Sequence, residues 1–107
     1  ENVIALKMGR DDRSMYPTLK PNDLIFIDRN SKEVAPPHNI CMARKPEGEF
    51  VIRRVTVHKL EEDTTVTFLA ENYLSYVPYV YSLKNSFGGS LENAILGKVI
   101  GVGHRYP

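Results

Sequence analysis

The sequence predicts a mainly β domain that is built from many short strands and contains little helix. Runs of β-branched and other apolar residues recur along the chain, turn-forming residues separate them, and the signals for helix are thin. The chain has 107 residues, which is enough to close one hydrophobic core but not two. We therefore expect residues 1–107 to form a single domain.

The expected strands follow one another closely in sequence. They cover residues 3–8, 24–27, 39–43, 50–57, 64–69 and 95–102, each bounded by charged or turn-forming residues. Residues 70–92 are predicted to be irregular, with one short strand near 79–83 and a simple turn at Gly88-Gly89. The only expected helical piece is a single turn near residues 15–19, where Pro17 is tolerated only near a helix start.

Two of these strands carry further structural information. In 50–57, a two-residue period places one set of side chains on one face (Val51, Arg53, Val55, Val57) and another set on the opposite face (Ile52, Arg54, Thr56). In 95–102, Gly97 and Gly101 are typical of a bent or bulged strand.

Pro21-Asn22-Asp23 predicts a tight turn into the strand at 24–27. Proline presets the first central position, and asparagine tolerates the positive φ that a type II turn needs at the second. Ser14 is therefore expected at a tight corner close to a core strand, where its hydroxyl is held at a fixed angle.

Composition excludes several classes of function. The 14 basic and 13 acidic residues give a net charge of +1, which leaves no electrostatic footprint for nucleic acid. The single cysteine, Cys41, cannot form an internal disulfide and fits a buried thiol in a reducing, cytoplasmic compartment. No apolar stretch approaches a membrane span, and we expect no membrane contact. Because the chain begins at Glu1, we expect a trimmed or processed piece that lacks an upstream module.

Other candidate sites are weak. The three histidines and Cys41 share no ligand spacing, so we predict neither a metal site nor a bound cofactor (His38, His58, His104). An aromatic cluster surrounds Val77-Pro78 without interleaved cations, and it is interpreted as a core edge or a protein–protein contact (Tyr73, Tyr76, Tyr79, Tyr81).

The segment 13–19, Arg-Ser-Met-Tyr-Pro-Thr-Leu, leads through Pro21-Asn22-Asp23 into a strand that ends at Asp28. This order resembles the serine segment of the LexA and phage-repressor family of serine–lysine peptidases. Later matches follow in the family's order, at Phe50 to Val55, at Glu71-Asn72 and at Ile95 to Val102. The resemblance implies the partly open β-barrel of short strands that this family shares with signal peptidases.

In the resemblance, Ser14 takes the place of the nucleophile and Arg53 takes the place of the lysine base, 53 − 14 = 39 positions later. A lysine must be neutral to activate a serine, whereas an arginine guanidinium stays protonated in proteins. Lys45 and Lys59 lie in charged, turn-adjacent stretches where a lysine is normally solvated, and His58 is a remote alternative base. The resemblance therefore implies a serine–lysine peptidase fold whose self-cleavage is lost.

Each residue of the pair also has a structural interpretation. Ser14 fits either a nucleophile or a turn residue that caps a local amide. For Arg53 we favour an ion pair with Asp11, Asp12 or Asp28, and the alternative is that it holds a peptide carbonyl or carboxylate in a cleft.

The function implied is that of a C-terminal oligomerisation and regulatory domain of a transcriptional repressor. Such a domain forms a homodimer and brings paired helix-turn-helix modules, here outside the chain, onto DNA half-sites. A RecA-like inducer or the protein's own linker peptide would be its partner. Two alternatives stay open: an active self-cleaving peptidase that uses Ser14, and a signal-peptidase relative. Against the latter, no membrane anchor is present, and residues 56–59 lack the glycine and proline with which signal peptidases continue.

Overall fold

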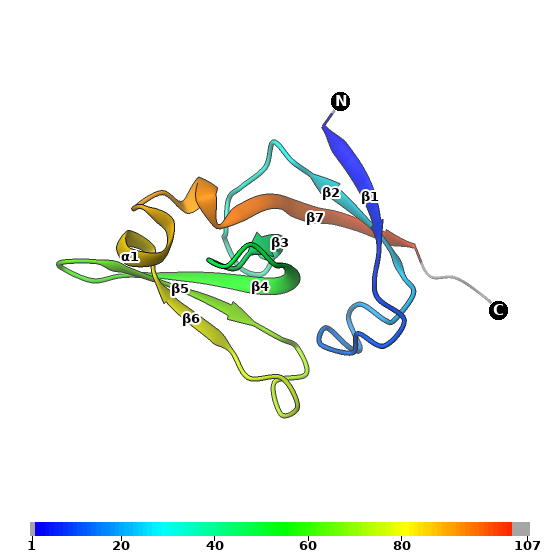
Figure 1. The fold of residues 1–107 in the computed structure, drawn as a ribbon. Coiled ribbons are helices and arrows are strands. Elements are labelled where there is room, and N and C mark those ends of the chain that lie inside the picture. The colour runs from blue at the N-terminus through cyan, green and yellow to red at the C-terminus, as the bar shows by residue number, and fades with distance from the viewer. Residues whose placement is uncertain (1, 104–107) are drawn as a thin grey trace.

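A computed structural model describes residues 2–103 of the chain. Within that range, seven strands form one antiparallel sheet, in the order β1-β2-β7-β3-β4-β5-β6 (Figure 1). The sheet is open, with β1 and β6 at its two edges. The elements are β1 (Val3–Lys7), β2 (Leu24–Asp28), β3 (Ile40–Arg44), β4 (Phe50–Lys59), β5 (Thr64–Leu69), β6 (Tyr79–Ser82), α1 (Leu83–Phe87), the 3-10 turn η1 (Leu91–Asn93) and β7 (Ile95–Gly103).

The prediction of a mainly β fold with short strands is confirmed, and each predicted strand is present within about two residues at either end. The prediction for helix is wrong in its position. Residues 15–19 form turns with a single helical hydrogen bond, from Leu19 N to Met15 O, whereas the helix of five residues is α1, in the segment expected to be irregular.

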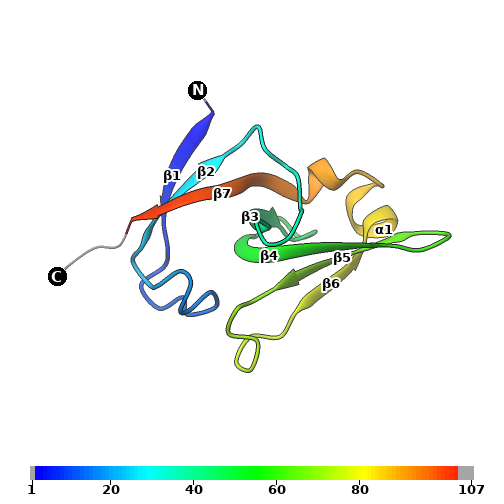
Figure 2. The same cartoon turned by 180° about the vertical axis from the view of Figure 1, so that it is seen from behind.

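Strand β7 connects the two halves of the sheet, because it pairs with β2 along one part and with β3 along another (Figure 2). Its register shifts by one residue at both contacts, opposite Phe26/Ile27 and opposite Met42/Ala43. The predicted bulged strand is therefore confirmed. At Gly97 the backbones approach so closely that a Cβ would be 2.8 Å from Asp28 O.

The hydrophobic core consists of two clusters, and β4 contributes to both. Val55 and the half-buried Val51 belong to a cluster with Val66, Phe68 and Phe87. Ile52 belongs to the other cluster, in which the largest members come from β2 and the loop before it. The predicted alternation of β4 is thus confirmed, and Arg53 lies on the face of Val51 and Val55.

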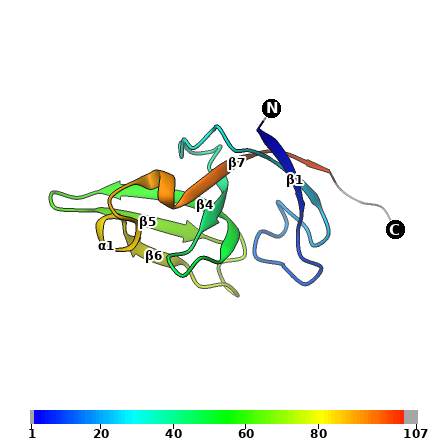
Figure 3. The same cartoon turned by 45° about the horizontal axis from the view of Figure 1, so that its top comes forward.

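Two loops meet at one end of the sheet, the β1–β2 loop (residues 8–23) and the β5–β6 loop (residues 70–78) (Figure 3). Asn72 N in the second donates to Ser14 O in the first at 3.0 Å, and Asn72 Nδ2 donates to Arg13 O at 3.3 Å. This junction carries the serine segment.

Candidate functional site

The β1–β2 loop is closed at its base by backbone hydrogen bonds between its two arms. Met8 N donates to Asp23 O at 2.8 Å, and Asn22 N donates to Met8 O at 3.2 Å. Asn22 has a φ of 69°, and Asp23 N donates to Lys20 O at 3.1 Å. The turn predicted at Pro21-Asn22 is therefore confirmed, and it fixes the path of the serine segment.

Ser14 is held by the buried residues that follow it. Met15 and Leu19 are 0% and 2% exposed and anchor the segment in the second core cluster. Ser14 itself is 0% exposed. The serine therefore lies inside the protein and not on an exposed corner.

Ser14 and Arg53 meet, as the resemblance implies. Arg53 Nη1 donates to Ser14 Oγ at 2.8 Å. Ser14 Oγ in turn donates to Asp12 Oδ1 at 2.6 Å. Asp12 Oδ1 also accepts from the backbone N–H of Ser14 at 3.0 Å. The serine hydroxyl thus links a guanidinium to a carboxylate, and it caps no backbone amide.

Arg53 is 5% exposed, and its contacts differ from those predicted. The ion pairs of the described residues join Lys45 to Glu47 and Glu49 and Arg54 to Glu71, so the direct pair expected for Arg53 with Asp11, Asp12 or Asp28 is wrong. The Ser14 hydroxyl lies between the Arg53 guanidinium and the Asp12 carboxylate and forms a hydrogen bond with each of them.

Two tyrosines and one carbonyl complete the surroundings of Arg53. Nη1 also donates to Ile52 O at 2.9 Å, and the guanidinium carbon lies 5.8 Å from the ring centres of both Tyr76 and Tyr79. At this distance a cation is attracted to the face of an aromatic ring. The Nε atom is buried and has no hydrogen-bond acceptor within the described structure.

None of the alternative bases predicted from the sequence contacts Ser14. Lys45 Nζ lies 2.7 Å from Glu49 and 3.3 Å from Glu47. The hydrogen bond to Glu49 raises the pKa of Lys45 above its ordinary value, which keeps this lysine protonated. His58 and Lys59 are exposed near the far end of β4, and at about 3.3 Å per residue His58 is roughly 16 Å along the strand from Arg53.

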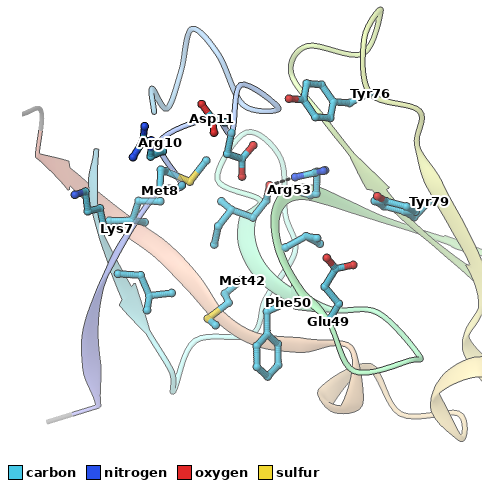
Figure 4. A pocket seen from close by; sticks show the side chains of 16 residues that line it. Lys7, Met8, Arg10, Asp11, Met42, Glu49, Phe50, Arg53, Tyr76 and Tyr79 are labelled. Atoms are coloured by element: carbon cyan, nitrogen blue, oxygen red, sulfur yellow. Dashed lines mark hydrogen bonds between the residues drawn. The ribbon is translucent and has the colours of Figure 1, made fainter. Parts of the chain in front are cut away.

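A cleft of about 650 Å³ opens beside this site and is called the Arg53 cleft below. Lys7 and Arg10 lie on one side of it, Tyr76 and Tyr79 lie on the other, and Arg53 lies between them (Figure 4). Asp12 and Arg53 line the cleft, but Ser14 does not. The serine is therefore behind the two charged side chains that bind its hydroxyl.

This arrangement opposes nucleophilic chemistry at Ser14. Attack requires an oxygen lone pair directed at a carbon about 3–3.5 Å away and a base that accepts the proton. Here Arg53 donates a hydrogen bond to the oxygen, and the hydroxyl donates its own hydrogen bond to a carboxylate, which is a weak base. The site therefore holds a neutral serine in place and presents a cation to the cleft.

Sequence reasoning missed two parts of the site. It treated Asp12 as an ion-pair partner of Arg53 and not of Ser14, although an aspartate commonly accepts from the amide two residues later. It also interpreted the four tyrosines around Val77-Pro78 as a core edge or a protein–protein contact. Tyr79 and Tyr81 do pack against the first core cluster, but the sequence did not predict that Tyr76 and Tyr79 lie at Arg53.

The remaining candidate features lie outside this site. Cys41 is fully buried, and burial raises the pKa of its thiol to about 11. No group of three histidine, cysteine or acidic side chains in residues 2–103 is placed to hold a metal ion. Among the described residues, no helix is long and apolar enough to cross a membrane. His104 lies outside the described residues.

Comparison of the sequence with protein-family models finds no matching family, and comparison with curated proteins finds no match. The LexA and phage-repressor assignment therefore stays a prediction from the motifs.

Proposed function

We propose that this chain is a non-cleaving, serine–lysine-peptidase-like domain that serves assembly and regulation in a cytoplasmic transcriptional repressor of the LexA and phage-repressor type. One observation carries the proposal: the buried Ser14 hydroxyl accepts from Arg53 and donates to Asp12, and no lysine of residues 2–103 forms a hydrogen bond with it. A peptidase of this type needs a lysine where Arg53 stands. Arg53 cannot act as the base, yet it is buried and hydrogen-bonded to Ser14. This combination favours a domain that serves assembly and not cleavage.

The surface of the β1–β2 arm supports the assembly part of the proposal. The face of these paired strands that is turned away from the core carries Val3, Ala5, Leu24 and Phe26, with Lys7 and Asp28 at its two ends. The opposite face lies in the core (Ile4, Leu6, Ile25, Ile27). Val3 is 43% exposed and Leu24 is 37% exposed. An exposed apolar strand face of this kind is typical of surfaces that pair with another copy.

The peptidase part is tested with a fluorophosphonate probe, which forms a covalent bond to a nucleophilic serine with loss of fluoride. We expect no labelling of the wild-type protein between neutral and alkaline pH. Arg53→Lys should gain labelling as the pH rises, and Ser14→Ala in that background should abolish it. Wild-type labelling that Ser14→Ala removes would contradict the proposal.

One contact favours the alternative of an active self-cleaving peptidase. Asp12 Oδ1 lies 2.6 Å from Ser14 Oγ, within the distance at which a general base takes a proton. If Asp12 serves as that base, wild-type labelling will be lost in Asp12→Asn as well as in Ser14→Ala. The same probe therefore separates the two functions.

A further inference from the structure

The β5–β6 loop is fixed at its two ends but has no apolar anchor between them. Ala70 is 2% exposed, and Tyr79 packs against the first core cluster. None of the described residues 71–77 belongs to either core cluster, and three of their large apolar side chains are exposed (Tyr73 64%, Leu74 89%, Val77 74%). A segment with few buried apolar contacts opens locally at a lower cost than the core. Polar contacts therefore determine whether this loop stays closed.

The first set of polar contacts joins the loop to the serine segment. Asn72 N donates to Ser14 O and Asn72 Nδ2 donates to Arg13 O, while the Tyr76 hydroxyl accepts from Arg13 N at 3.3 Å. Within the loop, Ser75 N and Tyr76 N both donate to Asn72 O at 3.1 Å. Residues 72–76 thus form a turn of their own, which can move as one unit.

The second contact is an ion pair that joins the loop to β4. Glu71 Oε1 lies 2.5 Å from Arg54 Nε and accepts from Thr18 Oγ1 at 3.3 Å. Arg54 is itself held in place, because its Nη1 donates to Pro37 O and to Asn39 Oδ1, each at 2.9 Å. The paired side chains of Glu71 and Arg54 are only 25% and 30% exposed, so water weakens their attraction less than at an open surface.

The loop lies over the buried pair of Ser14 and Arg53. The Tyr76 ring is 5.8 Å from the Arg53 guanidinium and forms part of the wall of the Arg53 cleft (Figure 4). Arg53 is 5% exposed although it lines that cleft, and its Nε is buried without an acceptor in the described structure. Movement of the loop away from the serine segment would remove the ring from Arg53 and the Asn72 donor from Ser14 O, and water would reach both groups.

From these contacts we infer that the β5–β6 loop is a hinged cover that shields the Ser14–Arg53 pair from water and is held closed by the Glu71–Arg54 ion pair. The hinges are the fixed ends at Ala70 and Tyr79. The inference goes beyond the proposed function, because it concerns the access of water to the pair and not the reactivity of the serine.

The test is hydrogen exchange followed by NMR in the wild-type protein at increasing urea, under conditions where exchange reports the opening equilibrium. The Asn72 amide reports the cover, and the Val55 amide, which donates to Asn39 O in the core, reports global unfolding. The Asn72 amide should exchange with a lower opening free energy and a weaker urea dependence than the Val55 amide. The Arg53 Nε–H should show the same weak urea dependence as Asn72.

Two variants separate opening of the cover from global unfolding. Glu71→Gln should speed exchange of the Asn72 amide and of the Arg53 Nε–H by the same factor, about five-fold or more, because the ion pair is lost. Val66→Ala, in the core, should speed exchange of the Val55 amide and leave the other two unchanged, since the open form keeps the core intact.

Three results would each overturn the inference. They are equal urea dependence of the Asn72 and Val55 amides in the wild type, unchanged exchange of Asn72 in Glu71→Gln, and faster exchange of Asn72 in that variant without faster exchange of the Arg53 Nε–H. Serine labelling reports the reactivity of Ser14, so failure of the cover and failure of the proposed function are distinguishable.

Discussion

Replacement of Ser14 by alanine distinguishes a structural serine from a catalytic one by the sign of its effect on stability. Ser14→Ala removes the acceptor of Arg53 Nη1 and the hydroxyl donor to Asp12. The guanidinium then keeps only Ile52 O as an acceptor, and Asp12 keeps only the backbone N–H of residue 14. Because Arg53 is buried, water does not readily replace the lost oxygen.

The expected cost follows from these two contacts. A hydrogen bond to a charged group contributes about 1.5–3 kcal/mol, and loss of one partner leaves the other desolvated. Asp12 is only half-buried, so water compensates part of its loss. We therefore expect Ser14→Ala to lower the free energy of unfolding by about 2–4 kcal/mol. For a domain of this size this corresponds to a Tm decrease of roughly 8–16 °C, at about 4 °C per kcal/mol.

Urea and thermal unfolding followed by circular dichroism provide the assay. Ser75→Ala is the matched control, because Ser75 is exposed and its hydroxyl makes no hydrogen bond to the described residues. It should change stability by less than about 0.5 kcal/mol. If Ser14→Ala is as stable as the wild type, or more stable, the structural role is refuted, since strained catalytic groups commonly cost stability.

Three further predictions test the assembly face, the packing of β7 and the buried thiol. Leu24→Glu should shift any self-association seen by sedimentation velocity towards the monomer. The control is Leu74→Glu, at a leucine that is 89% exposed on the β5–β6 loop, and it should not change the self-association. Equal effects of the two variants would show that the β1–β2 face is not the interface. Gly97→Ala should destabilise the protein by about 1–3 kcal/mol in urea unfolding, because the new Cβ would lie 2.6 Å from Ile27 Cγ2 and 2.8 Å from Asp28 O; an unchanged midpoint would show that β7 can move away. Burial raises the pKa of Cys41 to about 11, so the unfolded thiol ionises first and stability should fall between about pH 9 and pH 11. This fall should be smaller in Cys41→Ala, and a similar fall in both proteins would assign it to other groups.

The strands were predictable because their signals are local. β-branched runs bounded by turn residues give β2, β4 and β5 directly, and Asn22 adopts the positive φ that its turn requires. Helix α1 was missed because it has only five residues, although both ends carry signals. Ser82 Oγ accepts from Asn85 N, and Gly88 has a φ of 63°, so the glycine interpreted as a simple turn is a helix C-cap.

The site was less predictable because its contacts join distant parts of the chain. The Ser14–Arg53 contact came from the resemblance and not from local pattern, since 39 positions separate the two residues. Three aspartates were candidate partners of Arg53, and the sequence contains nothing that selects the bridged contact through Ser14. The two rings over Arg53 also come from distant parts of the chain. Tyr76 lies on the β5–β6 loop, which hydrogen bonds from Asn72 join to the serine segment, and Tyr79 begins β6.

The environment of Arg53 also predicts how a lysine would behave at this position. Arg53 is 5% exposed and forms no ion pair with the described carboxylates. A lysine at this position would lose most of its hydration, so its pKa in Arg53→Lys should be lowered. Asp12, one hydroxyl away, opposes this shift because its negative charge favours the ammonium form. Serine labelling of Arg53→Lys should therefore rise with pH, and adding Asp12→Asn should move the midpoint to lower pH. An unchanged midpoint would mean that the charge of Asp12 does not alter the pKa of the amine at position 53. The electrostatic effect inferred from the hydrogen bonds that join Asp12, Ser14 and residue 53 would then be wrong.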